Sequence, residues 1–365
     1  MKVLNLIWGF TLGAGIDKCF LTYARLGDVD HSVDVKSLCI NVLSRNSHIE
    51  PLKELGVDFI DINSPKDFRW IGKLAEYIRQ YKPDVLFTHG FNGAIMALIE
   101  RLVKGIKVKT VLTYHGSYHA PTRKKKLVEP IYNGLTHWIY THFADMTISV
   151  AEYSRQFLIS KGVPALKVVT VHNGIKDIPT PKPVDIQHEM VNIITASRID
   201  KVKGLSYMME AVEILKQRGL KFHYYMIGEG PELNEMKRIC KEKKLEDMVS
   251  FEGFQSNVPE WLAAADIFAL PSLYEYHSIA VLEAMRASKA IVATTVGGNG
   301  ESITDMEQGL MVPAADSKAF ADALERIIRD ADLRKRLSEN ARKRFEEEFT
   351  EDAMKRNLVR VIKGF

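Results

Sequence analysis

The chain has 365 residues, of which 46% are hydrophobic and 26% charged, with a formal net charge of +4. This composition is typical of a soluble globular protein and argues against a disordered or membrane-spanning chain, because no apolar run reaches the roughly 18 residues that a spanning helix needs. The three cysteines form no CxxC pair, which argues against a disulfide scaffold or zinc site and suits a reducing cytoplasm.

The charge is unevenly spread along the chain. Residues 1–175 contain 22 Lys and Arg against 15 Asp and Glu, whereas residues 176–365 contain 28 against 31. A basic half concentrates anionic ligands or anionic lipid surfaces around it. The first residues, MKVLNLIWGF, are interrupted too early by Gly9 to be a signal peptide and instead predict a buried first strand.

Short β-branched runs alternate with amphipathic stretches throughout the first half. The predicted strands are residues 3–8, 33–42, 57–60, 85–88, 108–114, 146–150 and 168–172. Helical patterns such as residues 70–81 and 92–103 lie between them. This alternation predicts βαβ units and a parallel sheet.

A glycine-containing turn, TLGAGIDK at residues 11–18, follows the first predicted strand. Gly13 and Gly15 would let the backbone approach a phosphate closely. The pattern ends in Lys18, however, and therefore fails the dinucleotide-binding fingerprint. A tight βα turn without a ligand is the alternative interpretation.

Two histidines follow predicted strands: His115 in VLTYHGSY and His89 in FTHGFNG. A side chain at the end of a parallel strand faces the ligand-binding edge of the sheet. An imidazole there can hydrogen-bond a ligand, although a structural histidine is the alternative. The other histidines show no grouping typical of metal ligands, so we predict no metal site.

A basic run, Arg123 to Lys126, begins a helical stretch whose apolar positions are Leu127, Ile131, Leu135, Trp138 and Ile139. Positive charge at a helix start opposes the helix dipole. We interpret the run as a contact for an anionic membrane surface or a polyprenyl-diphosphate acceptor, with Trp138 as an interfacial anchor. A solvated loop ahead of a core helix is the alternative.

A proline-rich segment, KDIPTPKPVDIQH at residues 176–188, separates the two halves. Its three alternating prolines favour an extended, semi-rigid link. We therefore predict an N-terminal domain at 1–175 and a C-terminal domain at 189–350, with the last helix, 351–365, packing back on the first domain. The strands predicted for the second half are residues 191–196, 222–227, 249–251, 267–270, 290–293 and 310–312. The predicted architecture is α/β, with two doubly wound parallel-sheet domains facing a cleft.

The segment LYEYHSIAVLEAM carries two glutamates, Glu275 and Glu283, eight positions apart. Ser278 can cap a helix whose first amides, at Ile279 and Ala280, would bind an anion such as a pyrophosphate. One carboxylate on each side could then accept hydrogen bonds from sugar hydroxyls. The two catalytic carboxylates of a glycosidase lie about 5–9.5 Å apart. Eight residues of a continuous helix span about 12 Å, so the spacing argues against a glycosidase. Two solvated surface glutamates remain the alternative.

A second basic element, TASRIDKVKG, places Arg198 and Lys203 at a strand-to-helix turn. Two cations five positions apart can hold phosphate oxygens, the arginine through its planar fork and the lysine as a point charge. We predict that this pair and the helix start after Ser278 bind the same anion.

Four segments, ASRIDKVKG, IGEGPE, FEGFQSNVPEWLAAAD and PSLYEYHSIAVLEAM, resemble in order and spacing the C-terminal half of the retaining GT-B glycosyltransferase family four. The resemblance implies two Rossmann-like domains and a metal-independent, cofactor-free transfer from a nucleotide-activated sugar with retention of configuration. It also implies roles for individual residues. By this resemblance, Glu283 would bind the ribose and Glu275 the hexose of the donor. The diphosphate would be bound by Arg198, Lys203 and the amides of Ile279 and Ala280, and Gly15 would approach the donor phosphate. The base would be bordered by Gly228, Phe254 and Val258, and His115 would contact the transferred sugar.

Two features qualify the resemblance. The family usually has a glycine directly after the first glutamate and another small residue two positions on, where this chain has Tyr276-His277-Ser278. We expect the bulk of Tyr276 and His277 to reshape the sugar pocket. The loop GGNGE at residues 297–301 matches the family, either as a structural turn or as a lid that touches the ligand.

The predicted function is transfer of a hexosyl group from a UDP- or GDP-sugar to a glycan or lipid-linked acceptor, in surface polysaccharide or lipid-linked glycan assembly. A nucleotide-sugar epimerase or phosphorylase and a non-catalytic sugar-binding protein are the alternatives. Nucleic-acid binding is not expected, because basic residues are not interleaved with stacking aromatic residues. The expected location is the cytoplasm, with the inner face of the membrane as an open alternative.

Overall fold

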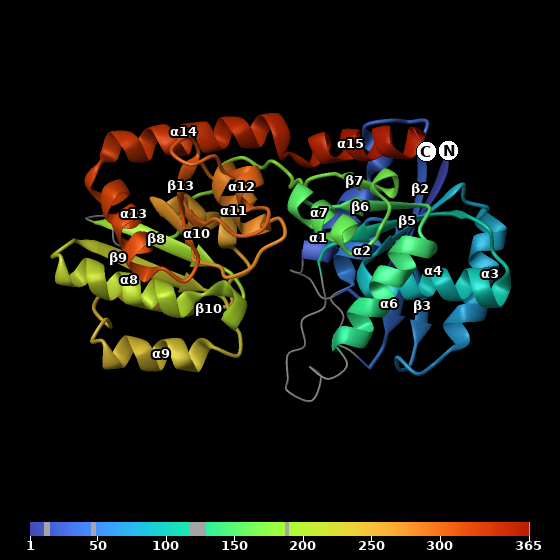
Figure 1. The fold of residues 1–365 in the computed structure, drawn as a ribbon, viewed down its shortest axis with the longest axis horizontal. Coiled ribbons are helices and arrows are strands. Elements are labelled where there is room, and N and C mark those ends of the chain that lie inside the picture. The colour runs from blue at the N-terminus through green and yellow to red at the C-terminus, as the bar shows by residue number, and fades with distance from the viewer. Residues whose placement is uncertain (11–14, 45–48, 117–128, 187–189, 365) are drawn as a thin grey trace. The chain divides into compact units, whose positions relative to one another are not determined.

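The computed structural model describes residues 1–10, 15–44, 49–116, 129–186 and 190–364. Its contacts divide the chain into two compact units. Unit 1 is Met1–Gly174 together with Glu351–Phe365, and unit 2 is Ile175–Thr350. Each unit contains one parallel sheet with helices on both faces (Figure 1). The predicted fold class, two doubly wound parallel-sheet domains, is confirmed.

The sheet of unit 1 has seven strands in the order β3-β2-β1-β4-β5-β6-β7. Their bounds are β1 Lys2–Trp8, β2 Asp34–Val42, β3 Asp58–Ile62, β4 Val85–His89, β5 Lys109–Tyr114, β6 Met146–Ser149 and β7 Val168–Thr170. The strand order reverses between β1 and β4, which pair in parallel with Val3 opposite Val85. In open α/β sheets, ligands bind at such switch points, beyond the carboxyl ends of the strands.

The sheet of unit 2 has six strands in the order β10-β9-β8-β11-β12-β13, with the same type of reversal between β8 and β11. Their bounds are β8 Val191–Ala196, β9 Phe222–Ile227, β10 Val249–Gly253, β11 Ile267–Leu270, β12 Ala290–Thr294 and β13 Gly309–Val312. All thirteen strands lie within a few residues of the predicted ones.

The helices connect successive strands and cover both faces of each sheet. In unit 1 they are α1 Gly15–Tyr23, η1 Leu26–Asp28, α2 Glu50–Glu54, α3 Arg69–Tyr81, α4 Gly90–Lys104, α6 Glu129–His142, α7 Glu152–Ser160, η2 Ala165–Lys167 and α15 Glu351–Lys363. In unit 2 they are η3 Lys201–Lys203, α8 Leu205–Gln217, α9 Leu233–Glu242, α10 Val258–Ala264, α11 Ile279–Arg286, α12 Asn299–Ser302, α13 Ser317–Arg329 and α14 Ala331–Glu348.

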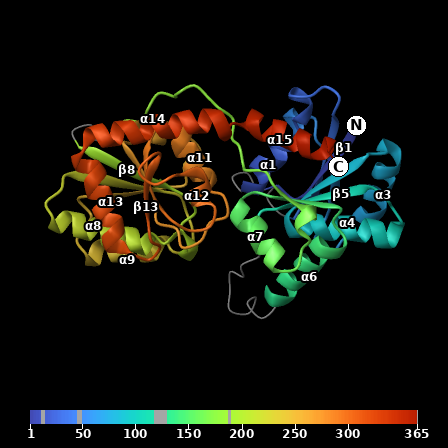
Figure 2. The same cartoon turned by 45° about the horizontal axis from the view of Figure 1, so that its top comes forward.

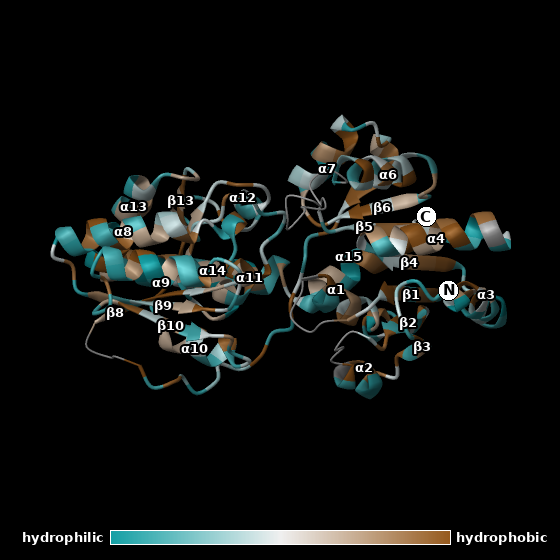
Figure 3. Cartoon of the chain, turned by 90° about the horizontal axis from the view of Figure 1, so that it is seen from below, coloured by the Kyte–Doolittle hydropathy of each residue, from teal (hydrophilic) through white to brown (hydrophobic). Residues whose placement is uncertain are grey.

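The central strands are largely buried and mostly hydrophobic, since helices cover both of their faces (Figure 3). Every residue of β12 is buried, for example, and the same holds for β4 and β11. Some polar side chains nevertheless lie within these strands, such as Thr88 and His89 in β4, and both are buried.

Helix α15 belongs to unit 1 although it ends the chain (Figure 2). Met354, Leu358 and Ile362 are buried in one hydrophobic cluster with Val3 and Phe87 of the first sheet. The buried Lys355 amine also lies 3.3 Å from the Asp28 carboxylate in η1. Unit 1 is consequently completed by a segment that follows the whole of unit 2.

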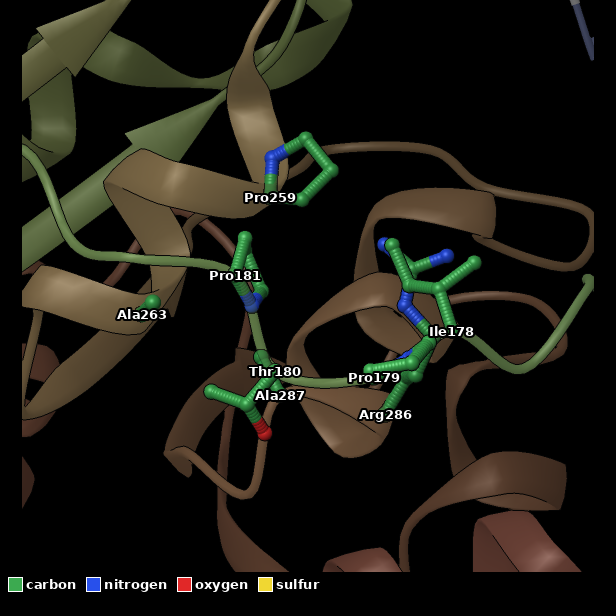
Figure 4. A pocket seen from close by; sticks show the side chains of 8 residues that line it. All are labelled: Ile178, Pro179, Thr180, Pro181, Pro259, Ala263, Arg286 and Ala287. Atoms are coloured by element: carbon green, nitrogen blue, oxygen red, sulfur yellow. The ribbon is translucent and has the colours of Figure 1, made fainter.

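The proline-rich segment packs on unit 2. Ile178, Pro179, Thr180 and Pro181 line a small hollow together with residues of α10 and the end of α11 (Figure 4). Arg342 of α14 donates two hydrogen bonds of 2.8 Å to the Asp177 carboxylate, and these bonds lower the pKa of Asp177. The bidentate pair fixes the beginning of the segment on α14.

Shortening Leu358 tests how much α15 contributes to unit 1. We expect Leu358→Ala to lower the free energy of unfolding by about 2–5 kcal/mol, because the side chain is fully buried and its removal leaves a cavity. The neighbouring Asn357 is exposed, and Asn357→Ala should change stability by less than about 0.5 kcal/mol. Urea denaturation measures both variants, and equal midpoints would contradict the assignment of α15 to the core of unit 1.

Candidate functional site

Two loops meet at the carboxyl ends of β8 and β11 in unit 2. The first, residues 197–204, follows β8, and the second, residues 271–278, follows β11. The backbone N–H of Leu273 donates a hydrogen bond of 2.7 Å to the carbonyl oxygen of Val202. This bond sets the register between the loops, so that charged side chains from distant parts of the sequence meet.

Lys203 and Glu275 form an ion pair between these loops. The Lys203 Nζ lies 2.7 Å from Glu275 Oε1, and both side chains are largely buried. The hydroxyl of Ser272 donates a second 2.7 Å hydrogen bond to the same oxygen. Both bonds therefore end on the same carboxylate oxygen, Oε1.

Arg198 lies in the same loop but is far more exposed, with 74% of its side chain accessible. It forms an ion pair with Asp200, whose carboxylate also accepts a hydrogen bond from the Val202 N–H at the start of η3. Asp200 therefore connects Arg198 to the turn that carries Lys203.

Helix α11 begins beside the ion pair, as predicted. Ser278 is its N-cap, and the serine Oγ accepts a hydrogen bond from the Val281 N–H at 3.4 Å. Ile279 and Ala280 occupy the first two helical positions, whose N–H groups lie outside the helix's own hydrogen-bond ladder. Glu283 lies one turn further along the helix. The helix start thus offers amide donors and a positive dipole end next to Lys203 and Glu275.

The three residues expected beside a nucleobase have different surroundings. Gly228, directly after β9, has a φ of +132°, and a β-carbon there would lie 1.9 Å from the Ser197 carbonyl oxygen, so glycine is required for packing alone. Val258 opens α10 and packs against the core of unit 2. Phe254, after β10, leaves 67% of its surface exposed and is the aromatic face available for stacking.

The structure corrects the expectation for His277. Its side chain is buried, 3.1 Å from Ser302 Oγ, and its ring lies 5.6 Å from that of Phe349. His277 therefore points into unit 2 and cannot narrow a sugar pocket. Tyr276 remains partly exposed and makes an edge-to-face contact with Tyr274, so the bulk near Glu275 comes from these two tyrosines.

The loop at residues 297–301 packs closely against the backbone of Glu275. Gly297 has a φ of +53°, and a β-carbon there would lie 1.7 Å from the Glu275 carbonyl oxygen. Asn299, in the short helix α12, is buried and donates a hydrogen bond of 3.0 Å to the Thr294 carbonyl. A side chain at position 297 would therefore displace the Glu275 backbone.

In unit 1, His89 and His115 lie at the ends of β4 and β5. His89 is buried, His115 is partly exposed, and their ring nitrogens lie 3.4 Å apart. Burial lowers the pKa of His115 to about 4, and burial together with the neighbouring His115 lowers the pKa of His89 well below its usual value. Both rings are therefore neutral at physiological pH. Gly15 begins α1, and residues 11–14 before it lie outside the described residues.

The basic run Arg123–Lys126 also lies outside the described residues, as does Leu127. The helix predicted after it is α6, but its apolar positions do not all face the core. Ile139 is buried, whereas Ile131, Leu135 and Trp138 are 68%, 38% and 48% exposed. Helix α6 therefore packs through one face and carries an apolar stripe on its exposed face, while the loop ahead of it lies outside the described residues.

The described residues contain neither a cluster of metal ligands nor a helix suited to span a membrane. No group of three or more His, Cys, Asp or Glu side chains gathers there as metal ligands would. None of the described helices combines the length and apolar character that crossing a bilayer requires.

Sequence reasoning did not single out Ser272 or Asn5. Ser272 donates a hydrogen bond to Glu275. Its position three residues before that glutamate in the same turn could have indicated this contact. Asn5 is a fully buried amide in the apolar strand β1, 2.8 Å from His89. A polar residue inside a hydrophobic strand could have indicated a partner, because buried amides are almost always hydrogen-bonded.

Comparison with known families covers most of the chain. Residues 180–344 match the family model described as glycosyl transferases group 1, and residues 39–177 match the model described as glycosyltransferase family 4. The first of these regions contains the sheet of unit 2, and the second covers much of unit 1.

Individual relatives agree with these matches. The amylovoran biosynthesis glycosyltransferase AmsK of Erwinia amylovora is 28% identical over 295 residues, covering 78% of this chain and 71% of that protein. The alpha-D-kanosaminyltransferase of Streptomyces kanamyceticus is 33% identical over 151 residues, 41% of this chain and 39% of that enzyme. The crystal structure of Anabaena Alr3699/HepE in complex with UDP and glucose superposes with a TM-score of 0.83 at 16% identity, covering 100% of both chains.

Substitution of two of the three glycines in the 297–301 loop, Gly297 and Gly300, tests the support of Glu275. Gly297→Ala should lower the free energy of unfolding by at least about 1–3 kcal/mol, because alanine is strained at this φ and its methyl group meets the Glu275 carbonyl. Gly300 has open space around it, so Gly300→Ala is the matched control and should be neutral or slightly stabilising. Thermal unfolding of both variants measures the difference, and a stable Gly297→Ala protein would contradict the described packing.

Proposed function

Because the chain belongs to the group 1 glycosyltransferases with the GT-B fold, we propose that it transfers a hexosyl group from a nucleoside-diphosphate sugar to an acceptor hydroxyl with retention of the anomeric configuration. The observation that carries this proposal is the ion pair of Lys203 with Glu275 at the carboxyl ends of β8 and β11, three residues before the N-cap of α11. A diphosphate sugar needs cations and amides for its phosphates and a carboxylate for its hydroxyls, and these groups lie together here.

In the proposed complex, the diphosphate lies at the N-terminus of α11. An ammonium group has three N–H donors, and the one that Lys203 gives to Glu275 leaves two for phosphate oxygens. The Ile279 and Ala280 amides and the helix dipole supply further donors. Arg198 would reach the phosphates by leaving Asp200, which its exposure permits.

Glu275 and Glu283 would bind the sugar portions of the donor. The ion pair with Lys203 and the hydrogen bond from Ser272 fix Oε1 of Glu275, and Oε2 would accept a hydrogen bond from a hexose hydroxyl. Glu283, a turn into α11, would accept from the ribose. Tyr274 and Tyr276 flank Glu275 and would determine which hexose fits.

Bond cleavage places negative charge on the leaving diphosphate while the hexose becomes cationic. Groups fixed in advance where that charge develops lower the barrier without reorganising. Lys203 is such a group, because its ion pair and the hydrogen-bonded turn beneath it already hold its side chain in place. We therefore assign the main rate contribution to Lys203 and the start of α11.

A UDP-linked hexose is the donor to test first, since the structurally similar HepE was crystallised in complex with UDP and glucose. AmsK is named for biosynthesis of the polysaccharide amylovoran. We accordingly propose a glycan or lipid-linked glycan as the acceptor of this chain.

We further propose that unit 1 contacts an anionic membrane surface through the apolar stripe of α6, formed by Ile131, Leu135 and Trp138. Arg101 and Lys104 are exposed at the end of α4, which packs beside α6. Exposed apolar residues next to cations are the combination that inserts into and is attracted to anionic lipid. Arg123–Lys126 would add charge ahead of the same helix.

Removal of the paired charges tests the donor site. We expect Lys203→Ala and Glu275→Ala each to lower turnover of the wild-type donor by about 100-fold or more, because each removes a fixed electrostatic contact to the reacting groups. Lys201, exposed in the same turn, supplies the control: Lys201→Ala should retain near-wild-type turnover. The assay follows release of nucleoside diphosphate, with thermal unfolding to confirm folding. Near-wild-type rates in Lys203→Ala or Glu275→Ala would refute the site.

Co-sedimentation with vesicles tests the membrane surface. The double variant Leu135→Ala/Trp138→Ala should bind vesicles containing anionic phospholipid several-fold more weakly than wild type, because it removes two of the three apolar side chains of the stripe. Leu166 is 99% exposed in η2, away from α6, so Leu166→Ala should bind like wild type. Equal binding of all three proteins would rule out the α6 stripe.

A further inference from the structure

A chain of three polar side chains runs through the interior of unit 1, from β1 to the end of β5. The Asn5 Oδ1 lies 2.8 Å from His89 Nε2, and His89 Nδ1 lies 3.4 Å from His115 Nε2. Asn5 and His89 are buried, and only His115 reaches the surface. The chain therefore leads from an inaccessible amide to His115, the one side chain of the three that a ligand can touch.

The orientation of the Asn5 amide is determined by its other neighbours. Its Nδ2 lies 3.0 Å from the Phe20 carbonyl oxygen and 3.1 Å from the Ser37 hydroxyl. A carbonyl oxygen can only accept, so the amide atom beside it must be the nitrogen. The amide oxygen then faces His89, and the Nε2 of His89 must carry a proton to donate to it.

His89 is neutral, so a proton on Nε2 leaves Nδ1 without one. The ring is enclosed by aromatic side chains, with the Tyr23 ring 4.7 Å and the Phe20 ring 5.9 Å away. Burial lowers the His89 pKa well below its usual value, and burial raises that of the Tyr23 phenol, so both stay uncharged. His89 Nδ1 is consequently an acceptor, and it faces His115.

The polarity of the chain determines which nitrogen of His115 carries the proton. To complete the contact with His89 Nδ1, the His115 Nε2 must be the donor. A neutral imidazole carries one proton, so Nδ1 of His115 has only its lone pair to offer. The ring can accept a hydrogen bond from a ligand hydroxyl but cannot donate one.

We infer that Asn5 and His89 are positioning residues, which fix His115 in the Nε2–H form so that its Nδ1 accepts a hydrogen bond from a substrate hydroxyl. The inference rests on the proposed function, since the hydroxyl belongs to the transferred sugar or the acceptor. His115 therefore selects for a substrate that has a hydroxyl at this point, over one in which an ether or a deoxy carbon replaces it.

Substitution of His89 by two residues of opposite character tests the role. In His89→Gln, the amide can donate to Asn5 and accept from His115, so the polarity of the chain is kept. In His89→Phe, the ring contacts with Phe20 and Tyr23 are kept but the acceptor for His115 is lost. A pure packing role favours phenylalanine in this aromatic environment, whereas the positioning role favours glutamine.

We expect kcat/KM of His89→Gln to stay within about threefold of wild type and that of His89→Phe to fall by about tenfold or more, as for a lost hydrogen bond. Thermal unfolding controls for folding. The assay uses UDP-glucose and its deoxy analogues, and His89→Phe should discriminate less between them. An equal or higher kcat/KM for His89→Phe would overturn the inference.

Nitrogen NMR of histidine-labelled wild-type protein provides a readout that needs no substrate. Ring nitrogen shifts identify which nitrogen carries the proton, and the His115 signal is assigned by its loss in His115→Gln. We expect the proton on Nε2, and a proton on Nδ1 would refute the inference. A wild-type protein that turns over no nucleotide sugar would overturn the proposed function, and the NMR result alone would then decide the polarity of the chain.

Discussion

The site in unit 2 depends on a backbone hydrogen bond between two loops far apart in the sequence. The Leu273 N–H to Val202 carbonyl bond joins the loop after β11 to the loop after β8. It places the ammonium group of Lys203 on the carboxylate of Glu275, 72 positions along the chain. Because each charge is held by the other and by hydrogen-bonded turns, the electrostatic groups are in place before a ligand arrives, and binding need not order them.

The two units contribute chemistry of opposite kinds. Unit 2 presents charges and a helix terminus, which suit a diphosphate donor. Unit 1 presents a neutral, partly exposed histidine at the end of β5, supported by buried amide and imidazole groups.

The sequence was sufficient for the strands and for the cap of α11, because buried β-branched runs and a serine before an apolar helix are local signals. It could not show that Glu275 pairs with Lys203, since that contact depends on how two loops align. It misjudged His277, whose ring enters the core beside Phe349. It also could not decide which side of α6 is buried, because Ile131, Leu135 and Trp138 have the same helical spacing whether they face the core or solvent.

The order of the chain through the two units has a consequence for dissecting the protein. Unit 2 is one uninterrupted segment inserted between Gly174 and Glu351, and its ends pair with each other through the Ile175 N–H and the Phe349 carbonyl, 3.0 Å apart. Unit 2 is therefore an insertion within unit 1. Unit 2 can be expressed as a single continuous segment, whereas unit 1 needs a short linker between residues 174 and 351 to retain its last helix. A simple truncation after residue 174 would instead leave unit 1 with an uncovered hydrophobic face.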